Sequence, residues 1–331
     1  MQTPIRIGTR ESQLAVWQAT QVKQLLEKDG IPAVLVFIKS EGDIDGNTPL
    51  YEMNVQGVFT RSLDIALLNH TIDIAVHSMK DVPTQLPEGV QQAAVLKRGA
   101  VHDLLVYKED LDFLLRKEQD VRQGQGVRKD QGVRKDQDVR KEQPVRIATG
   151  SIRRKAQWLH KYPSHEIHNL RGNVNTRLRK LSEESWDAAI FAQAGLERIG
   201  LRPEKSIVLD WMLPAPAQGA ILVACREGDE EAFAFCQPLD DPDTALCTKI
   251  ERDFLRSLLG GCSTPVSALA EIEDGDVYFS GQLLSPDGRQ NVTIEKILPV
   301  GIATGIGKTA GEELLERGGQ VIADSIRANT P

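Results

Sequence analysis

The sequence has few of the features that mark membrane, secreted or nucleic-acid-binding proteins. Aromatic residues make up 5% of its 331 residues, and its four cysteines form no Cys-x-x-Cys pair. No apolar run reaches the roughly 18 residues that a membrane span needs, so no membrane partner is expected. The 40 basic residues are outnumbered by 47 acidic ones, giving a net charge of −7. A general nucleic-acid partner is therefore not expected either.

The N-terminus lacks the charged and then apolar segments of a signal peptide. Residues 1–6 lead directly into a strand-like run, so we expect no export and a cytoplasmic location. Cysteines in such a chain are typically reduced thiols. Cys225 and Cys236 lie in apolar runs and are predicted to be core residues.

Short apolar segments alternate with amphipathic ones over the first 240 residues. A helix is predicted after the first strand, because apolar residues recur at helical spacing from Leu14 until Gly30. The alternation predicts an α/β protein with mostly parallel sheets and helices on both faces. The predicted strands are Ile5–Gly8, Ala33–Ile38, Asp73–His77, Val145–Ala148 and Asp187–Ala192.

The pattern changes from about Asp241 onwards. A long helix-like stretch is followed by three strand-like stretches and a last helix, which is typical of a small α+β domain. These segments are Thr244–Leu259, Val266–Glu271, Val277–Leu284, Val292–Leu298 and Ile306–Glu316.

A hexapeptide repeat interrupts the α/β pattern at residues 114–143. Its five units read LLRKEQ, DVRQGQ, GVRKDQ, GVRKDQ and DVRKEQ. Each later unit offers a single aliphatic side chain, which is too little to fill the core of a parallel β-helix. We interpret the repeat as a surface insertion that leaves the core intact, and a tether for a partner is the alternative. An RNA-binding role is weak, because the repeat contains no aromatic residue on which bases could stack.

Three places share one design, in which an apolar strand ends in small polar and basic residues and a helix begins. They span residues 8–12, 77–83 and 148–154. A helix N-terminus attracts anions, and hydroxyl and guanidinium groups there add charge-assisted hydrogen bonds. Serine and threonine also cap ordinary helices, so the pattern indicates an anion site only because it occurs three times. The side chains concerned are Arg10, Ser12, Ser78, Lys80, Thr149, Ser151, Arg153 and Arg154.

More arginines follow at Arg171, Arg177 and Arg198. In an acidic protein they favour a cleft for a ligand with many carboxylates, and solvated helix faces are the alternative. Asp81 follows Lys80 in a loop closed by Pro83. Its carboxylate could accept a hydrogen bond from a substrate N–H and stabilise a developing cation, whereas a surface Lys–Asp pair would contribute little.

Cys262 lies in a Gly-Gly-Cys-Ser-Thr-Pro loop. Two preceding glycines and a nearby proline predict an exposed thiol, which is a candidate nucleophile or attachment point. His160, His165 and His168 do not match a usual zinc spacing, so no metal site is predicted.

Together these segments resemble the porphobilinogen deaminase (hydroxymethylbilane synthase) family over nearly the whole chain apart from the repeat. The resemblance rests on RIGTRESQLAVWQA at 6–19, DIAVHSMKDVPT at 73–84, ATGSIRRKAQ at 148–157, LRGNVNTRL at 170–178, AGLERIGL at 194–201, AQGA at 217–220 and LGGCSTPV at 259–266.

The resemblance implies two lobes like those of type II periplasmic binding proteins, with the active site between them, and a smaller C-terminal α+β domain. We place the first domain at residues 1–98 and 218–240. The second covers 99–217 and includes the insertion at 114–143, and the third covers 241–331. The family is mostly monomeric, so a monomer is expected.

The resemblance also implies the chemistry. Cys262 would hold a dipyrromethane cofactor through a thioether. Porphobilinogen, the small-molecule substrate, would lose ammonia and be joined to that primer in four rounds, after which water releases the linear tetrapyrrole hydroxymethylbilane. Asp81 would be the catalytic residue. Cofactor binding would fall to Ser78, Lys80, Asp81, Thr149, Ser151, Arg153, Arg154 and Arg177, and substrate binding to Arg10, Ser12, Phe59, Arg171, Arg177 and Arg198.

The chain departs from the family in one loop. Residues 54–59 read NVQGVF, so Gln56 stands where many members have a lysine before Phe59. A noncatalytic anion-binding module on the same two-lobed fold is the alternative function. Asp81 and Cys262 together argue against it, because a simple binder needs neither.

Overall fold

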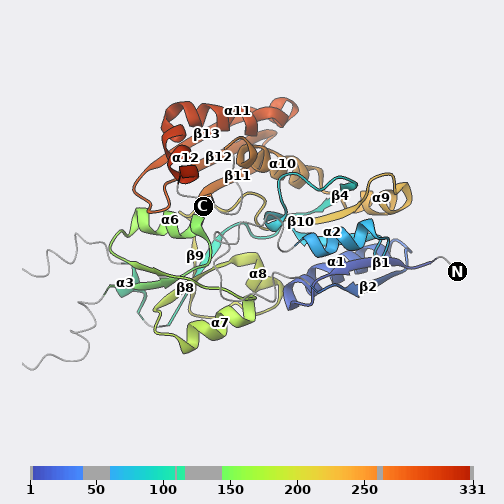
Figure 1. Ribbon diagram of the computed structural model, residues 1–331, viewed down its shortest axis with the longest axis horizontal. Helices are drawn as coiled ribbons and strands as arrows, with labels where there is room; N and C mark the ends of the chain where they lie inside the picture. Colours follow the sequence, from blue (N-terminus) through green and yellow to red (C-terminus); the bar gives the residue numbers. More distant parts are fainter. Residues whose placement is uncertain (1–2, 40–59, 109, 116–143, 259–263, 329–331) are drawn as a thin grey trace, which may run out of the picture.

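The computed structural model describes residues 3–39, 60–108, 110–115, 144–258 and 264–328. These residues form two five-stranded sheets and one three-stranded sheet. Figure 1 shows the three parts, with the first lobe mainly in blue, completed by teal β4 and gold β10 and α9, the second lobe mainly in green and the C-terminal domain in orange and red. Phe59, Gln56 and Cys262 lie outside the described residues.

The strands of the first sheet come from two stretches of the chain, one before the second lobe and one after it. Strand β1 pairs in parallel with β2 and β3, whereas β10 is antiparallel to both of its neighbours. In spatial order the strands are β2 (Ala33–Phe37), β1 (Ile5–Thr9), β3 (Ile74–Ser78), β10 (Ile221–Arg226) and β4 (Val90–Leu96).

The second sheet has the same plan, except that its antiparallel strand comes first along the chain instead of last. Here β5, the first strand along the chain, is antiparallel to both β8 and β9, while β6 pairs in parallel with β7 and β8. In spatial order the strands are β7 (Glu166–His168), β6 (Arg146–Ala148), β8 (Ala188–Ala192), β5 (Asp103–Tyr107) and β9 (Ser206–Leu209).

Two chain crossovers therefore join the lobes, from β4 to β5 and from β9 to β10. The two sheets have matching strand orders. Each also contains one strand that the chain forms directly after crossing from the other lobe, β5 in the second lobe and β10 in the first, and we call these the exchanged strands. This is the arrangement of type II periplasmic binding proteins, so the predicted fold class is confirmed. The expectation of mostly parallel sheets is wrong in one respect. The exchanged strand enters each sheet from the opposite direction, so half of the strand pairs in each sheet are antiparallel.

Helices cover both faces of the sheets, as predicted. In the first lobe, Ile7, Val22 and Ile74 pack on the side of α1, while Leu63 and Ala75 pack on the side of α2. The described helices of the lobes are α1 (Gln13–Lys28), α2 (Arg61–Leu68), α3 (Leu111–Leu114), α6 (Ile152–Lys161), α7 (Val174–Glu183), α8 (Gln193–Arg198) and α9 (Glu230–Cys236), with 3₁₀ turns at η3 (Met79–Asp81) and η4 (Gln237–Leu239). Cys225 and Cys236 are fully buried in this core, which confirms their predicted place.

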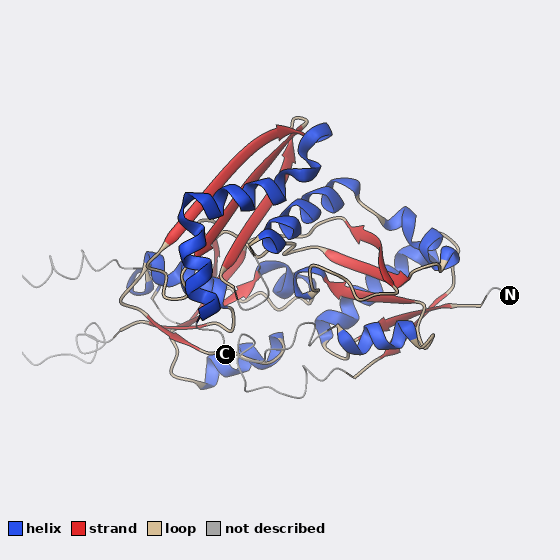
Figure 2. Cartoon of the chain, turned by 45° about the horizontal axis from the view of Figure 1, so that its top comes forward, coloured by secondary structure: helices blue, strands red, loops and turns tan. Residues whose placement is uncertain are grey.

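The C-terminal domain is an antiparallel sheet with helices along one side (Figure 2). Phe254 packs edge-on against Phe279 and fills the space over Gly281. After the predicted last helix, the chain turns at Gly318, which has a φ of 112°, and forms one more helix. The elements are α10 (Pro242–Ser257), β11 (Val266–Glu273), β12 (Asp276–Leu284), β13 (Asn291–Pro299), η5 (Val300–Gly305), α11 (Ile306–Leu314), η6 (Leu315–Gly319) and α12 (Gln320–Ala328).

The start of the repeat differs from the prediction. Leu114, the first residue of the first hexapeptide, ends α3 and is 2% exposed in the core of the second lobe. The two leucines of LLRKEQ give this unit the apolar content that the others lack, so it contributes to the fold. Residues 116–143 lie outside the described residues. None of the described helices is long and apolar enough to cross a membrane.

Candidate active site

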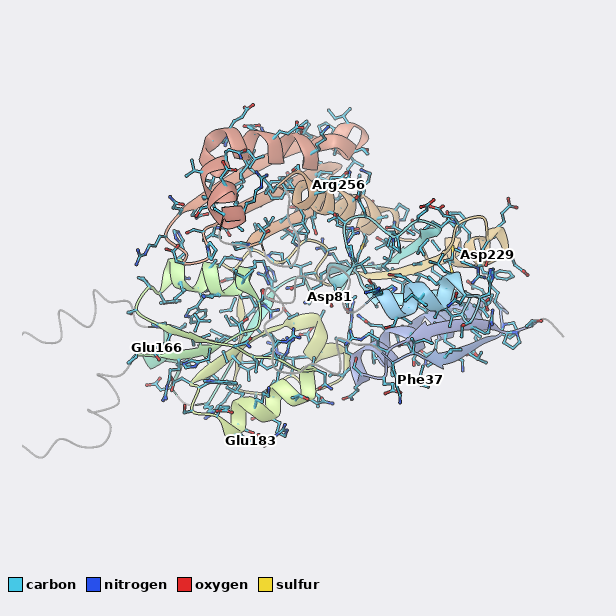
Figure 3. All side chains as sticks on the ribbon, in the orientation of Figure 1. Phe37, Asp81, Glu166, Glu183, Asp229 and Arg256 are labelled. Atoms are coloured by element: carbon cyan, nitrogen blue, oxygen red, sulfur yellow. The ribbon has the colours of Figure 1, made fainter. Side chains whose placement is uncertain are left out.

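Asp81 lies between the two lobes, beneath the C-terminal domain (Figure 3). It ends η3 (Met79–Asp81), a single 3₁₀ turn that follows β3. The amide of Met79 donates to the carbonyl of Ala220 at the start of β10, and the amide of Val82 donates to the carbonyl of Met79. The sequence predicted a helix here. Only one turn forms because Pro83 disfavours helical geometry at Val82, which is extended.

The other two strand-to-helix motifs do begin helices, and their hydroxyls act as caps. Ser12 accepts from the amide of Ala15 at 3.4 Å, and Ser151 accepts from the amide of Arg154 at 3.5 Å. Thr149 Oγ1 accepts from the amide of Ser151 at 3.2 Å. A hydroxyl that accepts from the backbone keeps its proton for another acceptor. These groups can therefore cap a helix and still donate to a bound anion.

Arg153 and Arg154 share one partner, Asp103, which was not predicted from the sequence. Asp103, at the start of β5, receives Nη2 of Arg153 on Oδ2 and Nη2 of Arg154 on Oδ1, both at 2.7 Å. All three side chains are almost completely buried. Burial alone would raise the pKa of Asp103, but the two guanidinium groups outweigh it and hold the pKa well below its usual value. The carboxylate therefore stays charged and fixes the direction of both arginines.

Gln218 connects this triad to the first lobe. Its Nε2 donates to Oδ1 of Asp103 at 2.9 Å, and its Oε1 accepts from Nζ of Lys80 at 3.3 Å. Burial lowers the pKa of Lys80 to about 8, and the attraction of Asp81 opposes that shift. One side chain in the second crossover thus links the strand-end turn of the first lobe with the buried carboxylate of the second.

Arg177 and Arg171 complete the positive surroundings from the second lobe. Nε of Arg177 donates to the carbonyl of Gly172 at 2.7 Å. Burial, together with the charge of Arg154, lowers the pKa of Arg177 to about 10, while Asp81 acts in the opposite direction. Arg171 is 3% exposed.

The loops must approach closely for these arginines to converge. A Cβ on Gly150 would lie 2.4 Å from the carbonyl oxygen of Leu170, so only glycine fits there. The structure therefore brings together Asp81, Asp103 and five cationic side chains, namely Lys80, Arg153, Arg154, Arg171 and Arg177.

Ser78, Arg10 and Arg198 lie around this cluster. Oγ of Ser78 accepts a hydrogen bond from Nε2 of Gln18 in α1 at 2.9 Å. Burial, helped by the charge of Arg10, lowers the pKa of His77 to about 4. Nη2 of Arg198 donates to the carbonyl of Gly219 at 2.6 Å, and its guanidinium lies 5.5 Å from the ring centre of Trp17. Arg198 therefore spans from α8 to the second crossover and to α1.

Comparison with known proteins identifies the family. Residues 5–234 match the family described as "Porphobilinogen deaminase, dipyromethane cofactor binding domain", and residues 245–316 match "Porphobilinogen deaminase, C-terminal domain". The chain belongs to the porphobilinogen deaminase family. Family membership confirms the predicted activity, that of a transferase in tetrapyrrole biosynthesis, and the predicted dipyrromethane cofactor.

Curated relatives from bacteria, archaea and plants match nearly the full length. "Porphobilinogen deaminase" from Syntrophotalea carbinolica is 38% identical over 328 residues, which cover 98% of this chain and 95% of that protein. "Probable porphobilinogen deaminase" from Methanocella arvoryzae is 36% identical over 324 residues and 98% of both chains. "Porphobilinogen deaminase, chloroplastic" from Oryza sativa is 38% identical over 336 residues, covering 98% of this chain and 86% of that protein.

Proposed function

We propose that this chain acts as a hydroxymethylbilane synthase whose catalytic group is the carboxylate of Asp81. The observation that carries this role is the place of Asp81 on a strand-end turn between the lobes, within the electrostatic reach of Lys80 and Arg177. Loss of ammonia from porphobilinogen leaves positive charge on the pyrrole. A fixed carboxylate stabilises that charge and accepts a hydrogen bond from the pyrrole N–H.

The described residues fit a dipyrromethane that carries four carboxylates. In the described cluster, four cationic side chains (Lys80, Arg153, Arg154 and Arg177) interact with two carboxylates, those of Asp81 and Asp103. Buried positive charge in excess is costly unless an anion compensates it. When bound, the cofactor would supply the free pyrrole α-position to which the first unit is joined, and each later unit would join the free end of the growing chain. Cys262 would attach it, and its carboxylates would be held by Ser78, Lys80, Thr149, Ser151, Arg153, Arg154 and Arg177.

Two kinds of arginine would share the carboxylates. Arg153 and Arg154 are fixed by Asp103, so they offer a preorganised surface whose direction does not depend on the ligand. Arg177 forms no ion pair among the described residues, so its terminal nitrogens can follow a lengthening chain. Arg10, Ser12, Phe59, Arg171 and Arg198 would bind incoming porphobilinogen together with Arg177.

The test is the intact mass of the purified protein beside a Cys262→Ser variant. We expect the wild type to exceed its sequence mass by two linked pyrrole units and the variant to lack that excess. Cys247→Ala, which removes a buried thiol in α10, is the matched control and should keep the excess. An unmodified wild type that stays unmodified after incubation with porphobilinogen would leave the noncatalytic anion-binding module as the function.

We also propose a monomer in a reducing, cytoplasmic compartment. The monomer is what the family resemblance implies, since members of the family are mostly monomeric. Cys225, Cys236 and Cys247 are free and buried, which suits a reducing environment. Light scattering on the eluting protein tests the first point, because a dimer mass would contradict it. Cell fractionation tests the second.

A further inference from the structure

Arg252 connects the C-terminal domain to the turn that carries Asp81. It lies on α10, and its Nη1 donates to the carbonyl oxygens of Met79 at 3.3 Å and Val82 at 2.9 Å. Its Nη2 donates to the carbonyl oxygen of Pro83 at 2.6 Å. These acceptors lie before and after Asp81 in the sequence, so one guanidinium holds both ends of the turn.

The turn needs such a partner. A single 3₁₀ turn leaves carbonyls at its C-terminal end without helical donors, and a cation is favoured there. Pro83 has no N–H of its own to continue the backbone hydrogen bonding. Within the described chain, the other backbone contact that anchors the turn is the bond from the amide of Met79 to Ala220.

The base of Arg252 is itself fixed. Glu251, the preceding residue on α10, is fully buried and receives Nη1 and Nη2 of Arg98 at 2.6 and 2.9 Å. It also accepts from the amides of Ala217 and Ala270, at 2.6 and 2.8 Å. The middle of α10 is therefore held by hydrogen bonds to the first lobe and to the second crossover.

The same helix precedes the predicted attachment residue in the sequence. In the sequence, Cys262 follows Arg252 by ten positions, and α10 continues through Ser257. We infer that Arg252 is a positioning residue for Asp81, which couples the cofactor-carrying domain to the catalytic carboxylate. The inference rests on the proposed function. Burial lowers the pKa of Arg252 to about 10, so the group stays charged at neutral pH.

The mechanism acts through backbone geometry. Without the guanidinium, the carbonyls of Met79, Val82 and Pro83 lose three donors and the turn can shift. A displacement of about 1 Å in a positioned group costs on the order of 100-fold in rate. Substrate carboxylates are bound by other residues, so kcat should fall much more than KM rises.

The experiment measures steady-state porphobilinogen turnover for four primer-loaded proteins: the wild type, Arg252→Ala, Arg252→Lys and Arg256→Ala. The loaded fraction of each is measured by intact mass, and kcat is normalised to it. Arg256 is the matched control, because it lies one turn further along α10, is exposed and pairs with Asp253. We expect Arg252→Ala to lose about 100-fold in kcat, with a KM within a few-fold of wild type, and Arg256→Ala to match wild type. Arg252→Lys should be intermediate, because one ammonium cannot reach three carbonyls as a planar fork does.

Chemical rescue separates positioning from general stability. Millimolar guanidinium chloride, against sodium chloride of equal ionic strength, should raise kcat of Arg252→Ala several-fold and leave Arg256→Ala unchanged. A wild-type kcat in Arg252→Ala, or a loss that guanidinium does not relieve and that follows a lowered Tm, would overturn the inference. Arg252→Lys supplies the comparison if the alanine variant does not fold or load. An inactive, unloaded wild type would instead contradict the proposed function.

Discussion

Glu251 and Arg98 form a two-pronged ion pair, at 2.6 and 2.9 Å, where the C-terminal domain meets the first lobe and the second crossover. The Glu251 carboxylate is fully buried and also accepts from two backbone amides, of Ala217 and Ala270. One side chain therefore satisfies donors from all three parts of the molecule. Opposing charges in good geometry, with the remaining lone pairs used, are what a buried ion pair needs.

Replacing Glu251 should destabilise the protein strongly. Glu251→Ala leaves the buried Arg98 guanidinium and two amides without partners, which costs about 3–5 kcal/mol of unfolding free energy. Urea denaturation measures this loss. Glu183→Ala is the control, because Glu183 forms an exposed pair with Arg179 and should stay within about 0.5 kcal/mol of wild type. Equal stability of the two variants would contradict the structural role of Glu251.

Asp81→Asn should separate charge from shape. The amide keeps the size of the side chain but loses the negative charge, so we expect kcat to fall by at least about 100-fold, as for other groups that stabilise transition-state charge. Thermal unfolding should change little. Asp324→Asn, at an exposed position in α12, provides the control for single Asp-to-Asn changes. Near-normal turnover by Asp81→Asn would exclude a catalytic charge at this position.

The pH dependence of primer loading should follow Lys80. Its pKa of about 8 means that raising the pH from 7 to 9 discharges the free-enzyme amine, which weakens its attraction for cofactor carboxylates. The measurement is the rate at which unloaded protein gains the primer mass, taken at each pH. Lys80→Arg stays charged throughout and should lose the decline near pH 8. A decline that persists in Lys80→Arg would assign it to another group.

The lowered pKa of Lys80 makes its contribution to stability increase with pH, which is opposite to its effect on primer loading. An unfolded lysine titrates near a pKa of about 10.4, so between about pH 8 and that value the unfolded chain binds more protons at this site. The contribution of Lys80 to the free energy of unfolding therefore increases with pH across this window. Urea titrations at pH 8 and pH 10 should show a smaller relative gain in Lys80→Met than in wild type.

The sequence predicted the elements whose signal is local. The parallel strands β1, β2, β3, β6 and β8 are apolar runs next to amphipathic helices, and each was predicted within one or two residues. The exchanged strands β5 and β10 were not singled out. Their neighbours in the sheets are far away along the chain, and nothing in a short window shows that a strand crosses to the other lobe.

The site shows the same limit. Arg153 and Arg154 were visible as a pair after a strand, but Asp103 lies 50 positions before Arg153 and reads as the polar start of an apolar run. Gln218 was noticed only as part of the AQGA segment. Arg252 lies in a helix with charges on several faces, where no spacing distinguishes a residue that reaches another domain. Long-range hydrogen bonds assign these roles, and a sequence window does not contain them.

Deleting residues 116–143 tests where the repeat begins to matter. We expect a variant with a short Gly-Ser linker between Leu115 and Pro144 to keep wild-type kcat and stability, because the sequence motifs of the predicted site all lie outside this range. A second variant that also removes Leu114 and Leu115 should lose about 2–5 kcal/mol, the cost of emptying a buried leucine position, since Leu114 packs in the core of the second lobe. Activity assays and urea denaturation distinguish the two. Inactivity of the shorter deletion, with its fold intact, would show that the repeat takes part in function, as the partner-tether alternative requires.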